Sequence, residues 1–188
     1  MKKEKPKKSG PAIFMYCIIA LSAVIAAVCL TLYYTRIAQN PWCFWPGVVF
    51  FTIMYHLWLR IIMGNVNKLF NINYNMWWFK EKSFDKPICK FFRVKKWKGK
   101  ALTYNPELFS LKNCSLNDIA NTTCKVETDH LVNVLISLST ILFSLLWGWW
   151  WIFAISAFCA ILFDMQFVLI QRHNRPRILR LIKRQKQI

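Results

Sequence analysis

One aspartate lies inside an apolar stretch of the chain, where an ionisable group needs either a partner or a task. Asp164 is the only acidic residue in the apolar runs 12–34, 43–63 and 131–170. Burying a carboxylate there is costly, so we expect it to face another polar group or to take part in proton transfer. His56 is the candidate partner, with Arg60 one helical turn further along the same face. A polar clamp between helices is the alternative to a catalytic role.

A histidine stands where a charged segment gives way to an apolar one. His130 follows Glu127 and Asp129 and precedes the apolar run that begins at Leu131. Imidazole changes its charge near neutral pH and is a common general base. A residue at this depth could contact both a water-soluble donor and a lipid-embedded acceptor. The catalytic candidates are therefore His130 and Asp164, while a solvated helix start is the simpler explanation for His130.

Two basic segments carry groups that could bind an anionic ligand. In the first, Arg93 and Lys98 would pair with anionic oxygens while Trp97 packs on an apolar surface. The second segment follows the last apolar run and offers Gln171, Arg172, Asn174, Arg175 and Arg177. Pro176 is expected to break this segment, and its neutral side chains add directional hydrogen bonds. Attraction to anionic headgroups is the alternative for both segments, and a membrane tether disfavours nucleic acid.

The seven cysteines and three histidines form no metal-binding pattern. No Cys-x-x-Cys pair or Cys/His metal spacing occurs in the sequence. Motifs such as Gly-x-Ser-x-Gly and the phosphate-binding loop are also absent, which argues against the common soluble hydrolase and nucleotidase mechanisms. We expect reduced cysteines, no metal and no bound cofactor.

The hydropathy pattern places these residues on membrane helices. The 188 residues are 56% hydrophobic, yet they carry 26 Lys and Arg against 8 Asp and Glu. As one helix, the run 131–170 would be about 60 Å long, twice the bilayer core, so we expect it to reverse at Trp147-Gly148-Trp149. The sequence predicts an all-α integral membrane protein, a single membrane domain over residues 1–188. Its expected transmembrane helices are about four in number, at residues 12–34, 43–63, 131–147 and 149–170.

The distribution of basic residues predicts the orientation of these helices. With four spans, one side receives the N-terminal tail, the loop 64–130 and the basic tail 171–188, which together hold 24 of the 26 Lys and Arg. The positive-inside rule makes that side cytoplasmic. We therefore expect a multi-pass protein of the cell membrane with both termini and a small structured basic loop in the cytoplasm. Its partners would include membrane lipids and their anionic headgroups.

Both basic segments resemble motifs of a known family. Residues 171–177, Gln-Arg-His-Asn-Arg-Pro-Arg, look like the Gln-Arg-Tyr-Asn-Arg-Pro-Arg signature of the glycosyl-4,4'-diaponeurosporenoate acyltransferase family. Residues 93–98, Arg-Val-Lys-Lys-Trp-Lys, are similar to its Arg-x-x-Lys-Trp-Lys loop motif. The resemblance covers residues 79–186. The family's Glu-x-x-His pair is expected at the start of the third span, where the nearest segment is taken to be His130-Leu131-Val132-Asn133.

The resemblance implies transfer of a fatty acyl group to a hydroxyl of a membrane-embedded glycolipid, such as a glycosylated carotenoid. His130 would be the base, and a lipid-linked acceptor would come from the membrane. Cations for an acyl-CoA or acyl-carrier-protein type donor would be supplied by Arg93, Lys98, Arg172, Arg175 and Arg177. The alternative is a non-catalytic lipid-binding or scaffold protein, or a small transporter. A transporter would be expected to show a repeat between its halves, and none is evident.

Overall fold

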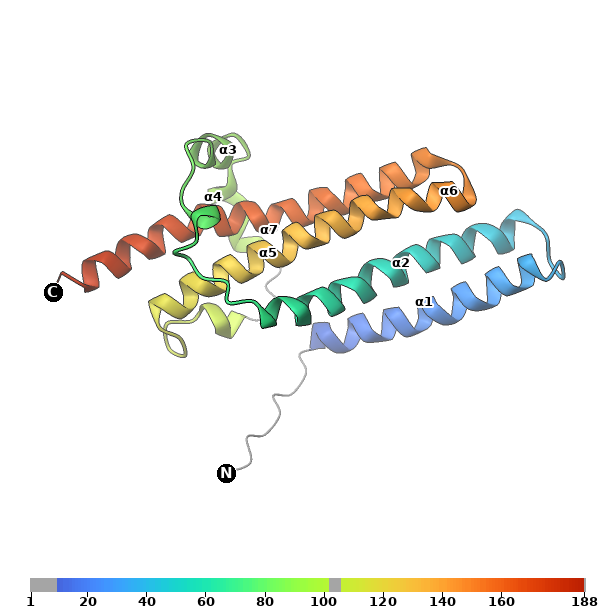
Figure 1. Ribbon diagram of the computed structural model, residues 1–188, viewed down its shortest axis with the longest axis horizontal. Helices are drawn as coiled ribbons and strands as arrows, with labels where there is room; N and C mark the ends of the chain where they lie inside the picture. Colours follow the sequence, from blue (N-terminus) through green and yellow to red (C-terminus); the bar gives the residue numbers. More distant parts are fainter. Residues whose placement is uncertain (1–9, 102–105, 188) are drawn as a thin grey trace, which may run out of the picture. The chain divides into compact units, whose positions relative to one another are not determined.

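The computed structural model describes residues 10–101 and 106–187, and every regular element within them is helical. Among these residues, four helices are long and apolar enough to cross a membrane (Figure 1). They fit a multi-pass membrane protein, so the predicted all-α membrane class is confirmed. The chain divides into two compact units, one up to residue 62 and one from residue 63 onward.

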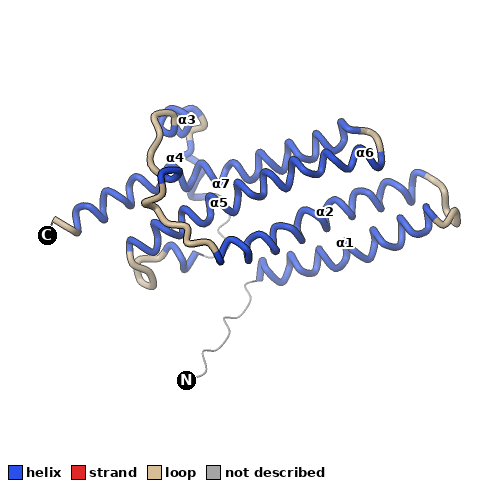
Figure 2. The backbone as a smooth tube through the Cα atoms, in the orientation of Figure 1, coloured by secondary structure: helices blue, strands red, loops and turns tan. Residues whose placement is uncertain are grey.

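The first unit is a helical hairpin of α1 (Gly10–Tyr34) and α2 (Pro41–Val66), joined by a short loop (Figure 2). Asn40 caps α2, because its side-chain oxygen accepts a hydrogen bond from the Cys43 amide at 2.9 Å. Pro41 then occupies the first helical position, where a missing N–H costs little. Near this turn the helices approach closely, since a Cβ on Gly47 would lie 2.8 Å from the Leu30 side chain.

The second unit is built on an antiparallel pair, α5 (Leu116–Ser139) and α7 (Trp150–Gln185) (Figure 1). Two short helices, η5 (Thr140–Phe143) and α6 (Ser144–Trp147), continue α5 to the turn. The chain reverses at Gly148, whose φ of 71° and ψ of −160° belong to a region that is essentially restricted to glycine. This turn sets the register in which α5 faces α7.

Helix α5 begins fifteen residues before the span expected to start at 131. Ser115 caps it in a capping box: its side chain accepts from the Asp118 amide, and the Asp118 side chain accepts from the Ser115 amide. The first half of α5 is rich in polar residues, so apolar runs in the sequence do not indicate that the helix begins at Leu116. One of its faces is nevertheless buried, including Ala120, Thr123 and Glu127.

Helix α7 continues well beyond residue 170, through Gln185. The expected break at Pro176 is wrong, because that proline lies inside the helix. Proline lacks the N–H that would bond to the carbonyl four residues earlier, yet the helix persists on both sides of it. The basic tail is therefore helical and holds its side chains at fixed positions around one axis.

Short helices fill the segment between α2 and α5, and several of them pack on the antiparallel pair. In chain order they are η1 (Asn67–Leu69), η2 (Trp77–Phe79), α3 (Asp85–Phe91), α4 (Val94–Trp97), η3 (Lys98–Lys100) and η4 (Pro106–Phe109). Phe79 and Ile72 pack with Cys124 of α5. Cys89 and Val94 pack with Ile170 of α7. The polar residues of this segment are thereby brought to the sides of α5 and α7.

Candidate functional site

The antiparallel pair brings together the two residues expected to do acid-base chemistry. Nδ1 of His130 on α5 lies 2.8 Å from Oδ1 of Asp164 on α7. The Asp164 side chain is fully buried, whereas that of His130 keeps 19% of its surface exposed. Asn133 donates from Nδ2 to the same carboxylate oxygen at 3.3 Å. The imidazole also stacks on Phe167, with ring centroids 4.4 Å apart and planes 7° from parallel.

This arrangement can hold an imidazole ready to accept a proton. If the Nδ1–H of His130 donates to the carboxylate, the lone pair resides on Nε2. No described residue forms a hydrogen bond with Nε2, and the ring is partly exposed. A carboxylate at Nδ1 also stabilises the imidazolium that forms when Nε2 takes a proton. Stacking on Phe167 fixes the plane of the ring.

Within the second unit, the Asp164 carboxylate has hydrogen-bond contacts with side chains of α5. They come from His130 and Asn133. The contact between His130 and Asp164 is not predicted from the sequence. The pairing of Asp164 with His56 stays a prediction.

A second polar cluster lies further along the same helix pair and centres on a buried glutamate. Glu127 is fully buried. One of its oxygens accepts from Nε of Arg172 at 2.9 Å, and the other accepts from Nη2 of Arg175. Arg172 also donates to Asp85 of α3 at 3.1 Å. The cluster therefore ties α3, α5 and α7 together through charge-assisted hydrogen bonds.

Sequence reasoning missed Glu127, although the signal was present. Residues 127–130 read Glu-Thr-Asp-His, so Glu127 and His130 have the Glu-x-x-His spacing directly before the segment 130–133. A third span that starts at 131 leaves Glu127 in the polar segment before it, so this spacing does not stand out from the sequence alone. With α5 starting at Leu116, the two side chains lie on the same side of one helix.

Arg175 has contacts that differ from those expected of a ligand-binding residue. It is only 2% exposed. Nε donates to the Thr123 hydroxyl at 3.0 Å, Nη1 to the Phe79 carbonyl at 3.3 Å, and Nη2 to the Thr123 carbonyl as well as to Glu127. All three guanidinium nitrogens are thus engaged within the protein. These contacts favour a role in holding helices together, and the expected binding role of Arg175 stays untested.

Three other residues predicted to bind a ligand lie on or beside α7, namely Lys98, Asn174 and Arg177. Nζ of Lys98 donates to the side-chain oxygen of Asn174 at 2.7 Å. Burial lowers the pKa of Lys98, and the positive charges of Arg177 and Lys95 lower it further. Arg177 and Lys95 are therefore close enough to repel the charge of Lys98. A nearby anion would relieve this repulsion.

Of the other residues predicted to bind a ligand, two pack within the protein and one is exposed to solvent. Trp97 donates from Nε1 to the Phe92 carbonyl at 2.9 Å and packs on the cluster of Cys89 and Val94. Arg93 is exposed and precedes α4 in a left-handed conformation, with φ of 50°. Gln171 is buried on α7. Among the described residues, no group of three or more His, Cys, Asp or Glu is arranged to hold a metal ion.

The chain matches a known protein family. A family model described as glycosyl-4,4'-diaponeurosporenoate acyltransferase matches residues 75–184, which is more than half of the chain. The match includes α5, α7 as far as Arg184, His130, Asp164 and both arginines that contact Glu127. No curated protein and no solved structure matches the chain.

Proposed function

Because the chain belongs to the glycosyl-4,4'-diaponeurosporenoate acyltransferase family, we propose that it transfers a fatty acyl group to a hydroxyl of a membrane-embedded glycolipid, such as a glycosylated carotenoid. The observation that carries the proposal is the contact between His130 and Asp164 within the matched region. It supplies the base that such a transfer needs. The reaction takes place in the cell membrane, near its cytoplasmic face.

The acyl donor in this proposal is a thioester, of the acyl-CoA or acyl-carrier-protein type. Nε2 of His130 takes the proton of the acceptor hydroxyl while that oxygen attacks the thioester carbonyl. The new C–O bond forms, the C–S bond breaks, and the proton passes from the imidazolium to the departing thiolate. Asp164 stabilises the imidazolium between these two steps, and Asn133 helps to fix the carboxylate.

Placement of His130 suits a reaction between a lipid-embedded acceptor and a donor from water. On α5 the residue follows a polar half-helix and precedes the apolar run from Leu131. On α7 its partner Asp164 lies in the apolar part, while the basic part begins at Arg172. The acceptor is expected to approach along the apolar side and the donor along the basic side.

The test is an acyl-transfer assay on the purified full chain in lipid nanodiscs, with an acyl-CoA, a glycosylated carotenoid and detection of the ester by mass spectrometry. His130→Ala should lower the rate by about 100-fold or more, the range expected for loss of a general base. Asp164→Asn should also slow transfer, because the imidazolium loses its carboxylate.

The matched control is Thr128→Ala, on the same turn of α5. Its hydroxyl donates only to the Cys124 carbonyl of its own helix among the described contacts, so transfer should stay near the wild-type rate. An undiminished rate in His130→Ala would exclude this residue as the base. Absence of any ester with the wild-type protein, for both CoA and carrier-protein donors, would contradict the proposed activity itself.

A further inference from the structure

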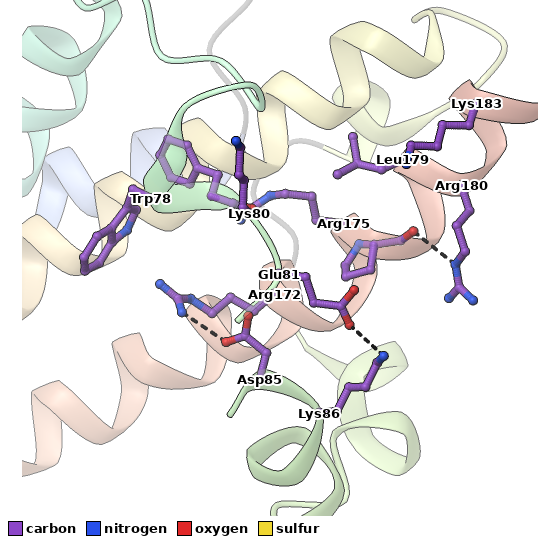
Figure 3. Close-up of a pocket in the computed structure, with 12 residues that line it drawn as sticks. Trp78, Lys80, Glu81, Asp85, Lys86, Arg172, Arg175, Leu179, Arg180 and Lys183 are labelled. Carbon is purple, nitrogen blue, oxygen red and sulfur yellow. Dashed lines mark hydrogen bonds and ion pairs between the residues drawn. The ribbon is translucent and has the colours of Figure 1, made fainter. Parts of the chain in front are cut away.

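A cavity of about 300 Å³ lies in the second unit, away from the contact between His130 and Asp164. One wall is the segment 78–86, and the other is the basic part of α7 (Figure 3). Its lining residues are Trp78, Phe79, Lys80, Glu81, Asp85, Lys86, Arg172, Arg175, Pro176, Leu179, Arg180 and Lys183. The cavity is therefore bounded by six basic side chains and two acidic ones.

The acidic side chains of the lining are already engaged. Asp85 accepts from Arg172, and Glu81 pairs with Lys86 at 3.2 Å (Figure 3). Among the described residues, no acid pairs with Lys80, Arg180 or Lys183. Three positive charges around one cavity attract an anion, and a phosphate offers several acceptor oxygens to such donors.

Apolar side chains form the rest of the wall and limit the kind of anion. Trp78 remains 47% exposed, and the Arg172 guanidinium carbon lies 5.5 Å from the centroid of its ring. Leu179 and Pro176 of α7 contribute aliphatic surface. A ligand that joins phosphate groups to an apolar or planar part matches both halves of this lining.

Helix geometry relates the cavity to the proposed reaction. Arg172 follows Asp164 by eight residues on α7 and Arg180 follows it by sixteen. At about 1.5 Å per residue these positions lie about 12 and 24 Å from Asp164 along the helix axis. A phosphate held here would therefore need a long arm to present a thioester at His130.

We propose that this cavity binds the phosphate groups of a ligand that also carries an apolar or planar part. The phosphate can come from a coenzyme A type donor or from the headgroup of an anionic phospholipid. Only the choice of a thioester donor rests on the proposed function. Lys80, Arg180 and Lys183 bind the phosphate oxygens, and Trp78 packs against the remainder.

The experiment measures binding to the purified full chain without acyl chain or acceptor. Coenzyme A is titrated by equilibrium dialysis in a neutral detergent, and thermal stability is measured in micelles with phosphatidylglycerol or phosphatidylcholine. The double variant Arg180→Ala/Lys183→Ala should weaken phosphate binding by at least about tenfold, since two charge-assisted hydrogen-bond donors are lost. The control, Arg184→Ala/Lys186→Ala, removes equal charge from positions of the same segment that do not line the cavity.

Coenzyme A binding that is weakened only in the cavity variant supports the proposal and identifies a donor of that type. A stabilisation by phosphatidylglycerol that is lost only in the cavity variant, without coenzyme A binding, supports it with a lipid as the source. Equal losses in both double variants, or no binding of either probe, would overturn it. None of these results depends on acyl transfer, so the two proposals fail separately.

Discussion

Glu127 and Arg175 illustrate how a buried charge in this protein is stabilised by several partners at once. The glutamate receives donors from two arginines, and Arg175 in turn contacts a hydroxyl and two backbone carbonyls. Burying ions costs several kcal/mol each, so removal of one partner leaves another charge uncompensated. The arrangement depends on the planar guanidinium, which directs its donors to α5 and to the segment around Phe79 simultaneously.

Arg175→Lys should therefore lower stability even though the charge is kept. Lysine cannot reproduce the hydrogen bonds from Nε and from both terminal nitrogens, and we expect a loss of about 1.5 to 3 kcal/mol in unfolding free energy. Unfolding of the purified protein in mixed micelles with increasing SDS would measure it. Arg177→Lys is the control, since Arg177 is exposed and should tolerate the change. A fully stable Arg175→Lys protein with weakened ligand binding would instead restore the role expected from the sequence.

The sequence identifies the candidate catalytic residues but does not show which of their side chains are in contact. His130 and Asp164 stand out because each is ionisable and adjoins or interrupts an apolar run. Their contact depends on the register of α5 against α7, which is set by long-range packing and by the turn between the helices. Glu127 was counted with the loop because its neighbours are polar, and only the helix that begins at Leu116 makes its burial apparent.

Helix α5 and helix α7 each combine an apolar half with a polar half in one continuous element. Hydropathy locates the apolar halves, because a span requires about 20 apolar residues. It does not locate the polar extensions, where burial of a single face decides whether the helix continues. In α7 that face includes Val168, Gln171 and Arg175, at spacings of three and four residues.

The turn between these elements leads to a prediction on Gly148. Its backbone conformation, with φ of 71° and ψ of −160°, is strained for any residue with a Cβ, although there is open space around it. Gly148→Ala should therefore cost about 1 to 3 kcal/mol and loosen the contact of α5 with α7. Gly99→Ala is the control, because that glycine has open space and no positive φ. Melting temperatures in detergent that fall equally in both variants, or in neither, would contradict the argument.

For the whole molecule, the even number of candidate spans and the uneven charge distribution point to the same topology. In the second unit, the hairpin of α5 and α7 returns the basic end of α7 to the end at which α5 starts. In the first unit, the hairpin likewise separates the Thr35 to Asn40 turn from the start of α1 and the end of α2. If the four spans cross the membrane one after another, Lys and Arg outside them fall almost entirely on segments of one side.

The final prediction is that this basic side is cytoplasmic. Lysine and arginine near short connections favour retention inside the cell, and only Arg36 lies in the opposite connection. In a cysteine-free background, single cysteines replacing Lys100 and Lys186 should resist a membrane-impermeant maleimide in intact cells and react after permeabilisation. A cysteine replacing Ala38 should react in intact cells. Labelling of the Lys100→Cys variant in intact cells would show that the orientation is the opposite one. A water-soluble acyl donor would then have to reach His130 from the other side of the membrane.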